Sequence, residues 1–462
     1  MGLITKFRLA SLSSFVFLLA AQVASAESLS GALLEAYRKN PTLNAARAGQ
    51  RATDEFVPQA LAGWRPTVSA QGAVQQSWTD SSASSNFGNN HSYILPTQET
   101  YAIQLKQPVF HGFRTTESTR VAEAQVRGGQ QQLLATEQVV LLNGVQAYLD
   151  VIRDRSTVRL RQQNLVVLND QLKASNARFK AGELTRTDVA QSMAGVATAK
   201  AALAGTVSQL RGSEATFEQI IGHQPGKLES APAARPPISL DQAFDIAHET
   251  NPQILAAAQA ADAAEHNVGV AFSGLLPQAD VTGTYTYQAI QNGLTNPATS
   301  TSNLTVQGIL NVPIYEAGLL YSQVRQAKQK ASQSRIGVID TTRQIRQAVA
   351  TNWAAYVASK QAVQSSTTSV SASQTAYDGT RQEYQVGSRS TIDVLNAEQT
   401  LLNAQISEVS LQHDLILASY RLQASIGHLT GRHLHLGTPY DPAQNYNEVH
   451  YKWIGTHADV LQ

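Results

Sequence analysis

Cysteine is absent from the 462 residues of this chain, and charged residues make up only 15% of it. The lack of cysteine excludes disulfides, thiol catalysis, iron–sulfur clusters and cysteine-based zinc sites. The 35 Lys and Arg residues nearly balance the 34 Asp and Glu residues, so there is no basic surplus to neutralise a phosphate backbone. Binding to nucleic acid is therefore not expected.

Catalytic signatures are also missing. The sequence contains no G-x-S-x-G, no H-E-x-x-H, no phosphate-binding glycine loop and no dinucleotide fingerprint. His433 and His435 have the spacing of a metal pair, but they lie in a polar tail with no cysteine or matched partner, and a solvated tail is the preferred interpretation. We expect no enzyme activity, no cofactor and no metal site.

The first 26 residues have the pattern of a secretory signal peptide. Lys6 and Arg8 precede an apolar stretch over residues 9–20, and the small residues 24–26 offer a cleavage site before Glu27. The stretch is shorter than the ~20 residues that a membrane helix needs, and no comparable run follows it. The mature chain is expected to be exported, and then either soluble or held in a membrane by strands.

The mature sequence contains an internal duplication, with repeats over 27–232 and 233–432. A proline-rich segment, 231–237, joins them, and a polar tail, 433–462, follows. Matched motifs recur in the same order: Asn40-Pro41 and Asn251-Pro252, Pro66 and Pro277, then 107–110 and 312–315, 179–182 and 384–387, 188–189 and 393–394, and 221–223 and 426–428.

After the paired prolines the apolar periodicity changes to two, which predicts β-hairpins over about 66–110 and 277–315. Each strand has about ten residues, the length of a tilted strand that crosses a membrane. The tips, 79–92 and 291–302, are rich in Ser, Asn, Thr and Gly and are predicted to be exposed loops.

A soluble sandwich would fit the strand pattern equally well, but the signal peptide and the lack of cysteine favour an outer-membrane barrel. In lipid every backbone donor and acceptor must be paired, and the smallest known barrels have about eight strands. Four strands leave two open edges. The chain is therefore expected to close a barrel only as an oligomer, at least a dimer.

Two proline-free segments, 112–180 and 318–385, predict long α-helices, because they are dominated by Ala, Gln, Val, Leu and Arg. Gly182 and Gly387 are suited to the left-handed conformation that ends a helix, and a second helix is expected to return from each. The returning helices carry coiled-coil spacing, at Val189, Met193, Val196, Leu203, Val207, Leu210 and Phe217, and at Leu395, Leu402, Ile406, Val409, Ile416 and Tyr420.

These motifs, together and twice in order, resemble those of the TolC family of outer-membrane channel-tunnels over nearly the whole mature chain. The resemblance is carried by the two Asn-Pro openings, the strand ends at 107–112 and 312–318, and the hairpin 384–395. It implies a mixed α/β membrane protein, mainly α, with long antiparallel coiled-coil helical hairpins and four transmembrane β-strands per protomer. A homotrimer would close these into a 12-stranded β-barrel on a 12-helix α-barrel.

The same resemblance implies a location in the cell outer membrane, in contact with its lipid, with a periplasmic helical extension. The implied partners are a periplasmic adaptor (membrane fusion protein) and an inner-membrane pump, either ABC or proton-driven.

A gate at the periplasmic mouth, close to Gly182 and Gly387, is also implied by the resemblance. Asp393 matches a family aspartate that faces the narrowed pore, where three copies would favour cations and raise one another's pKa. A second family aspartate is replaced by Asn396, which implies weaker cation selectivity. The positions whose polar contacts hold the family's mouth shut are matched by Thr187, Asp188, Tyr384 and Arg389.

Simpler roles exist for the same residues. Asp188 and Asp393 fall in the first turn of a predicted helix, where a carboxylate caps free backbone amides. Arg389 fits a solvated loop position equally well, and the two glycines are expected to be mainly structural.

The expected function is a passive exit duct for drugs or proteins, in efflux and/or type I secretion. The alternative is a periplasmic adaptor or scaffold protein with coiled-coil hairpins. Adaptors normally carry a single hairpin flanked by soluble β-domains, whereas this chain duplicates both its hairpin and its strands. An exported hydrolase is a third class, and it would need a site motif that the sequence lacks.

Overall fold

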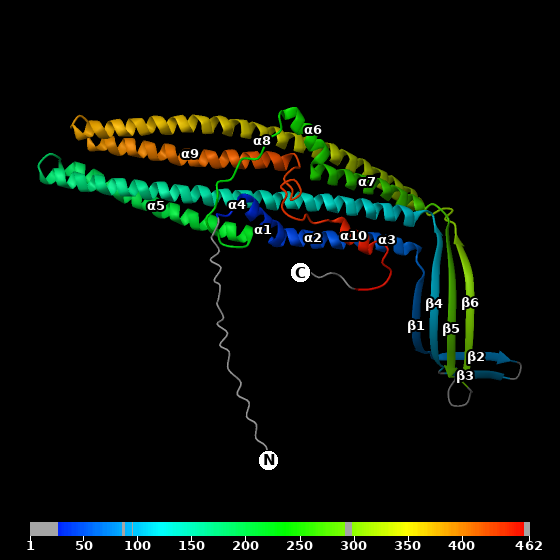
Figure 1. Cartoon of the computed structure of the whole chain (residues 1–462). Helices are drawn as coiled ribbons and strands as arrows, with labels where there is room; N and C mark the ends of the chain where they lie inside the picture. Colours follow the sequence, from blue (N-terminus) through cyan, green and yellow to red (C-terminus); the bar gives the residue numbers. More distant parts are fainter. Residues whose placement is uncertain (1–25, 86–87, 95, 292–297, 457–462) are drawn as a thin grey trace, which may run out of the picture.

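The structure is a computed structural model that describes residues 26–85, 88–94, 96–291 and 298–456, so the predicted signal peptide up to residue 25 lies outside the described residues. A long helical body carries a β-sheet at one end (Figure 1). Among the helices of the described residues, none combines the length and hydropathy needed to span a bilayer.

The helices are described here by the two repeats predicted from the sequence. The first repeat contains α1 (Leu29–Lys39), α2 (Pro41–Asp54), α3 (Phe56–Leu61), the 3-10 turn η1 (Ala62–Trp64), α4 (Arg114–Lys180) and α5 (Arg186–Ile221). The second contains α6 (Leu240–Thr250), α7 (Pro252–Ser273), α8 (Leu319–Gln385) and α9 (Thr391–Ser425), and α10 (Ala443–Val449) follows in the tail. The two predicted long helices are confirmed: α4 and α8 have 67 residues each, about 100 Å at ~1.5 Å per residue.

The Asn-Pro openings tie the start of each repeat to its end. The Asn40 side-chain oxygen accepts the Thr42 amide (3.0 Å), and its Nδ2 donates to the Ile220 carbonyl (3.0 Å). Asn251 does the same with the Gln253 amide and the Ser425 carbonyl, both at 2.9 Å. Proline then fills the first helical position, where no N–H is needed. The duplicated motif is thus a helix cap that also clasps the last long helix of its repeat.

The main core lies midway along the body, where α1 packs between the long helices. Its largest fully buried side chains include Leu33, Leu141, Tyr148, Phe217 and Ile221. The Tyr148 hydroxyl lies 2.7 Å from the Glu27 carbonyl and 2.8 Å from the Glu229 carbonyl, so it holds the start and end of the first repeat together. A smaller core, Ala243, Ala247, Ile254, Ile345, Val349, Leu422 and Ile426, serves the second repeat.

The four predicted strands form one antiparallel sheet in the order β1 (Thr67–Gln76), β4 (Thr97–His111), β5 (Gln278–Gln291) and β6 (Thr299–Asn311). Directly opposed residues share a face of a sheet. Val68 opposes Leu105, Ile103 opposes Tyr285, and Tyr285 opposes Leu304. The apolar faces of the single strands therefore join into one exposed apolar face across both repeats.

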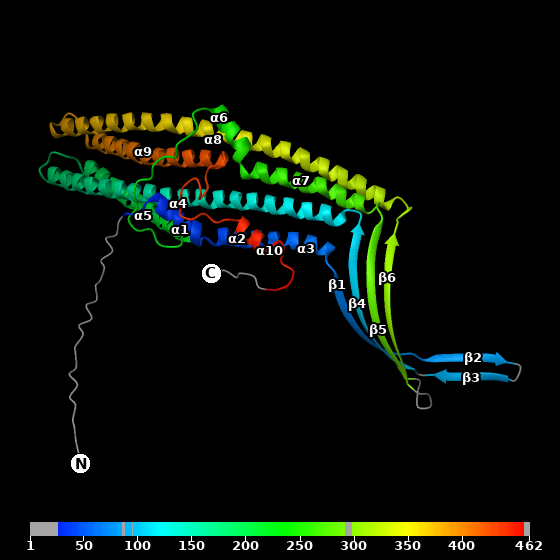
Figure 2. The ribbon, with the colours of Figure 1, turned by 45° about the vertical axis from the view of Figure 1, so that its right-hand side comes forward.

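The predicted loop over 79–92 is wrong. β2 (Thr79–Ser85) and β3 (Gly88–Ile94) form a separate antiparallel ribbon beyond β1 and β4 (Figure 2). Backbone hydrogen bonds hold such a ribbon, and the polar composition of the segment predicted a loop instead. At the second tip β6 already begins at Thr299, which shortens the predicted loop, and residues 292–297 lie outside the described residues.

The predicted seam of the returning helices holds in part. Val196 and Phe217 on α5 are buried, as are Leu402 and Tyr420 on α9, but Met193 is 61% exposed in the single chain. The other predicted seam positions are half-buried, including Val189, which lies nearer the turn than Met193.

His433 and His435 are exposed, as the solvated interpretation of the polar tail expects, but other parts of the tail pack against the first repeat. Residues 429–456, here named the C-terminal strap, run along α2 and α3 (Figure 1). The Tyr440 amide donates to the Tyr37 hydroxyl (2.9 Å), and Asn445 donates to Asp54 (2.8 Å). His433 stacks on the His428 ring, with centroids 4.5 Å apart. Composition alone could not show the contacts with Tyr37 and Asp54, because these partners lie far away in the sequence.

Candidate functional site

Both helical turns lie at the end of the body opposite the sheet, and the two views agree on this (Figures 1 and 2). The turns are copies of each other. Gly182 and Gly387 have φ of +82° and +81°. Each glycine donates to the carbonyl three residues earlier (3.0 and 3.1 Å), and the next residue donates to the carbonyl five residues earlier (2.9 Å in both). The positive φ is the reason for glycine here, since an added Cβ would meet nothing within 4 Å at either position.

Asp188 and Asp393 close matched capping boxes after these turns. Asp393 Oδ2 accepts the Ser390 amide (3.0 Å) and hydroxyl (2.6 Å), and Asp188 Oδ2 accepts the same groups of Thr185 at 3.0 and 2.7 Å. These hydrogen bonds hold the pKa of both carboxyls below its usual range. The capping role is thus present within one chain. In an assembly, repulsion between the Asp393 carboxylates of different copies would raise their pKa and so oppose the lowering by the capping box.

Tyr384 joins the two hairpins. Its ring is buried, the Arg178 guanidinium of α4 lies 4.7 Å from the ring centroid, and the Thr391 hydroxyl lies 3.5 Å from the phenol oxygen. Sequence reasoning selected Tyr384 but missed Arg178. Its only signal was a basic residue in the last turn of α4, which dipole compensation already explains.

The remaining predicted gate residues are not gathered around Tyr384. Arg389 pairs with Glu383 of its own hairpin at 2.8 Å, and this pairing raises the pKa of the guanidinium. Thr187 and Asn396 are exposed on α5 and α9. Within one chain the site is therefore one cross-hairpin contact with separate exposed polar groups around it.

A cavity of about 280 Å³ lies behind Tyr384, between α4 and the second hairpin. Arg178, Arg381, Tyr377 and Glu398 line it. The buried Glu398 accepts from Asn164 of α4 at 3.0 Å. Burial and the neighbouring Glu398 raise the pKa of Tyr377 to about 12. Incomplete packing at this level means that the two hairpins are joined by a few polar contacts rather than by a filled apolar core.

Farther from the turns, His413 of α9 is buried against α4, where the two hairpins meet. Its Nε2 lies 3.0 Å from Asp150, and its Nδ1 lies 2.9 Å from Asp414. Burial alone would lower the pKa of His413, but the contacts with these two carboxylates outweigh it and raise the pKa. Arg153 also reaches Asp150 (2.8 Å) and Asp154 (2.8 Å). The repeats thus meet along a charged, titratable seam.

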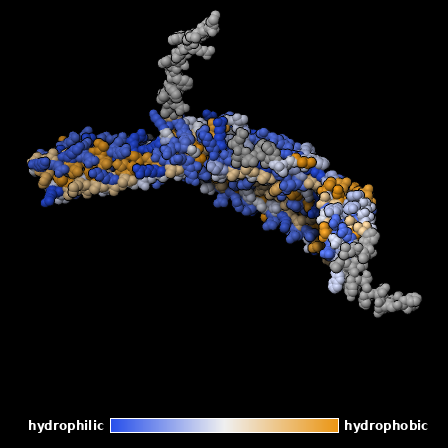
Figure 3. Space-filling view, turned by 90° about the horizontal axis from the view of Figure 1, so that it is seen from below, coloured by the Kyte–Doolittle hydropathy of each residue, from blue (hydrophilic) through white to orange (hydrophobic). Residues whose placement is uncertain are grey.

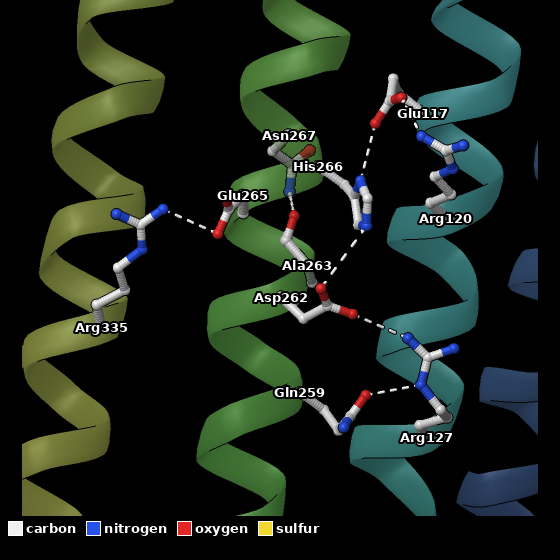
Figure 4. Close-up of polar contacts among 10 residues, drawn as sticks. All are labelled: Glu117, Arg120, Arg127, Gln259, Asp262, Ala263, Glu265, His266, Asn267 and Arg335. Atoms are coloured by element: carbon white, nitrogen blue, oxygen red, sulfur yellow. Dashed lines mark hydrogen bonds and ion pairs between the residues drawn. The ribbon is translucent and has the colours of Figure 1, made fainter.

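Near the sheet a denser polar network fixes the repeats to each other. It runs from α4 through α7 to α8 (Figure 4). Its contacts are Arg127–Asp262 (2.9 Å), Arg127–Gln259 (2.7 Å), His266–Glu117 (2.8 Å) and Arg335–Glu265 (2.8 Å). The body is therefore clamped next to the sheet and more loosely joined near the turns.

Exposed apolar side chains gather at both ends of the molecule. Figure 3 shows apolar patches on the sheet and also along the hairpins towards the turns. Apolar side chains are exposed on the sheet at Val68, Val74, Ile103, Leu304, Val306 and Leu310. A continuous exposed apolar face is typical of a surface that meets lipid or another subunit.

The comparison with known families settles the class of protein. A family model described as outer membrane efflux protein matches residues 32–223 and 243–428, one match for each repeat. The chain belongs to this family. Its members are channel and transport proteins, and this chain lies in the outer membrane with its helices extending into the periplasm.

Relatives and solved structures agree with this assignment. The chain is 36% identical over 439 residues to the outer membrane efflux protein BepC of Brucella suis, covering 95% of this chain and 93% of the relative. It is 26% identical to the outer membrane protein TolC of Vibrio cholerae over 68% of this chain and 73% of the relative. The fold is similar to the outer membrane channel CmeC of Campylobacter jejuni, with a TM-score of 0.76 at 14% identity, covering 92% and 89% of the two chains. The adaptor alternative is not favoured.

Proposed function

We propose that three copies of this chain form a gated exit duct that works with a periplasmic adaptor and an inner-membrane pump. The observation that carries this proposal is the four-stranded sheet with β1 and β6 at its edges and one exposed apolar face. A sheet in lipid must leave no open edge. Pairing β6 of each copy with β1 of the next closes the ring, and three copies supply the 12 strands that the family resemblance implies.

The gate is proposed to lie at the two turns. Contact between Arg178 and Tyr384 holds the hairpins of one copy together, and the few contacts around the nearby cavity let them separate without disrupting the clamp near the sheet. Asp393 would line the narrowed mouth as one carboxylate per copy, while its capping box keeps it ionised.

Transport is proposed to be passive in this chain. The energy would come from the pump, and adaptor binding at the hairpins would offset the contacts broken when the gate opens.

Efflux of small molecules is the transport proposed first. The relative with 36% identity is named an efflux protein, whereas a relative from Pseudomonas aeruginosa at 22% identity is named an alkaline protease secretion protein. Protein secretion through the same duct is the second candidate.

A deletion strain tests both candidates. Loss of the chain should raise sensitivity to several unrelated drugs, and the unmodified gene should restore resistance. A strain with unchanged drug sensitivity but missing extracellular proteins would favour secretion. No change in either measurement would reject the export function. Recovery of the protein as a detergent-free soluble monomer would reject the duct itself.

A further inference from the structure

The C-terminal strap lies outside the part of the chain that the family model matches, which ends at residue 428. The strap is nevertheless held at several points along the first repeat. The Gly431 amide donates to the buried Glu137 (2.6 Å), and the Arg47 guanidinium lies between the rings of Tyr37 and Tyr440 (4.6 and 5.0 Å). The strap therefore has a fixed path that runs from the central core towards the sheet.

That path ends at the foot of β1. Arg65, two residues before β1, donates to the Lys452 carbonyl (3.1 Å), and its guanidinium lies 4.8 Å from the Trp453 ring centroid. The preceding residue, Trp64, accepts from Gln107 of β4 through its carbonyl (3.1 Å). The end of the strap is thus anchored where the sheet leaves the helical body.

The side chains gathered there are apolar and exposed. Tyr451 is 73% exposed, Trp453 66%, Ile454 91% and the adjacent Trp64 40%. We name these four residues the foot patch. Two tryptophans, a tyrosine and an isoleucine held out into water by a fixed backbone indicate a surface with a partner.

We propose that the foot patch inserts into the periplasmic surface of the outer membrane, so that the C-terminal strap is a lipid anchor at the base of the sheet. Two features of the structure select lipid. The patch is anchored through Arg65 next to the start of β1, and the first apolar residue of that strand, Val68, is exposed. Its residue types are those of the aromatic belts at the membrane interface, where Trp and Tyr place a ring in the apolar region and a polar edge at the headgroups. Arg65 beside Trp453 adds a cation at the depth of the phosphates.

This proposal rests on the proposed duct in the outer membrane. The experiment below distinguishes failure of the lipid anchor from failure of the membrane-inserted sheet. The full-length mature protein is reconstituted in vesicles of phosphatidylethanolamine and phosphatidylglycerol whose acyl chains carry bromine at defined depths. Replacing Trp64, Trp78 and Trp353 by Phe leaves Trp453 as the one tryptophan, whose emission is excited selectively over that of tyrosine. Trp453 should lose more emission to bromine near the headgroup than to bromine near the chain end.

Two matched variants calibrate the result. A chain that keeps only Trp353 of α8, which packs beside the core of the second repeat, should not be quenched. A chain that keeps only Trp78, just after β1, reports insertion of the sheet itself. If the triple replacement does not assemble, the loss of quenching between the unmodified chain and Trp453→Phe measures the same contribution.

Quenching of Trp78 without quenching of Trp453 would overturn the lipid anchor and leave the duct intact. Unquenched blue-shifted Trp453 emission would place the foot patch against a neighbouring copy, and unquenched red-shifted emission would place it in water. Absence of quenching at both positions would reject the membrane-inserted sheet as well.

Discussion

Replacing Arg178 by alanine should favour the open gate. The change removes the contact between α4 and the buried Tyr384 ring. A partly exposed cation–π contact contributes ~0.5–1 kcal/mol, so three copies that open together would lose ~1.5–3 kcal/mol of closed-state stability. Because ~1.4 kcal/mol is a tenfold change, the ratio of open to closed channels should rise by roughly ten- to hundredfold. Single-channel recordings in planar bilayers measure this ratio directly.

Two controls make the result specific. Arg186→Ala removes an exposed arginine at the same end of the molecule, in the first turn of α5, and should leave the ratio unchanged. Tyr384→Phe keeps the ring and removes only a hydroxyl whose contact is long (3.5 Å), so its effect should be smaller than that of Arg178→Ala. Equal opening in Arg178→Ala and Arg186→Ala, or no opening in either, would refute the cross-hairpin contact as the element that holds the gate.

Three further predictions follow from the seam and the turns. Asp393→Asn should weaken block by multivalent cations in single-channel recordings. Asp188→Asn, which weakens the matching capping box, should leave the block unchanged. Equal block in the unmodified protein and in both variants would show that Asp393 does not line the pore. Because folding raises the pKa of His413, its protonated form stabilises the fold fully below the unfolded pKa of ~6.5, and this stability is lost as the pH rises through the pKa of the folded state. His413→Gln should therefore reduce the decrease in melting temperature that the unmodified protein shows above about pH 6.5. Gly427→Ala should prevent folding or strongly lower the melting temperature, since a Cβ there would lie 2.5 Å from a carbonyl of the α6–α7 junction at φ +89°. Gly182→Ala, with φ +82° and open space around it, should cost only about 1–2 kcal/mol.

Much of the fold could be predicted because the information is local and repeated. Each Asn-Pro opening, each run without proline and each turn glycine carries its meaning in a few neighbouring residues, and the duplication supplies every motif twice. The alternation of apolar residues likewise gave the strands and their common face. The pairing of β4 with β5 joins the two repeats, and its register places the apolar residues of both strands on the same face.

The parts that failed are those that depend on distant partners. The β2–β3 ribbon has a polar sequence without the alternation that marks a strand. The strap is held by Tyr37, Asp54 and Glu137, which come some 300 to 400 residues earlier. The proposed gate could be predicted only in outline. Tyr384 and Asp393 came from a family resemblance, whereas Arg178 emerged only when the two hairpins were placed side by side. The partner of Arg389, Glu383, lies in the same hairpin.

The two edge strands of the sheet also determine how one defective copy affects the whole ring. Each copy offers β1 on one side and β6 on the other, so the proposed ring of three copies would need every copy to be intact at both edges. One defective subunit opens the whole ring. If intact and edge-damaged chains are made in equal amounts and mix at random, only roughly one ring in eight contains none of the damaged kind. A single faulty allele would therefore act dominantly over a healthy one.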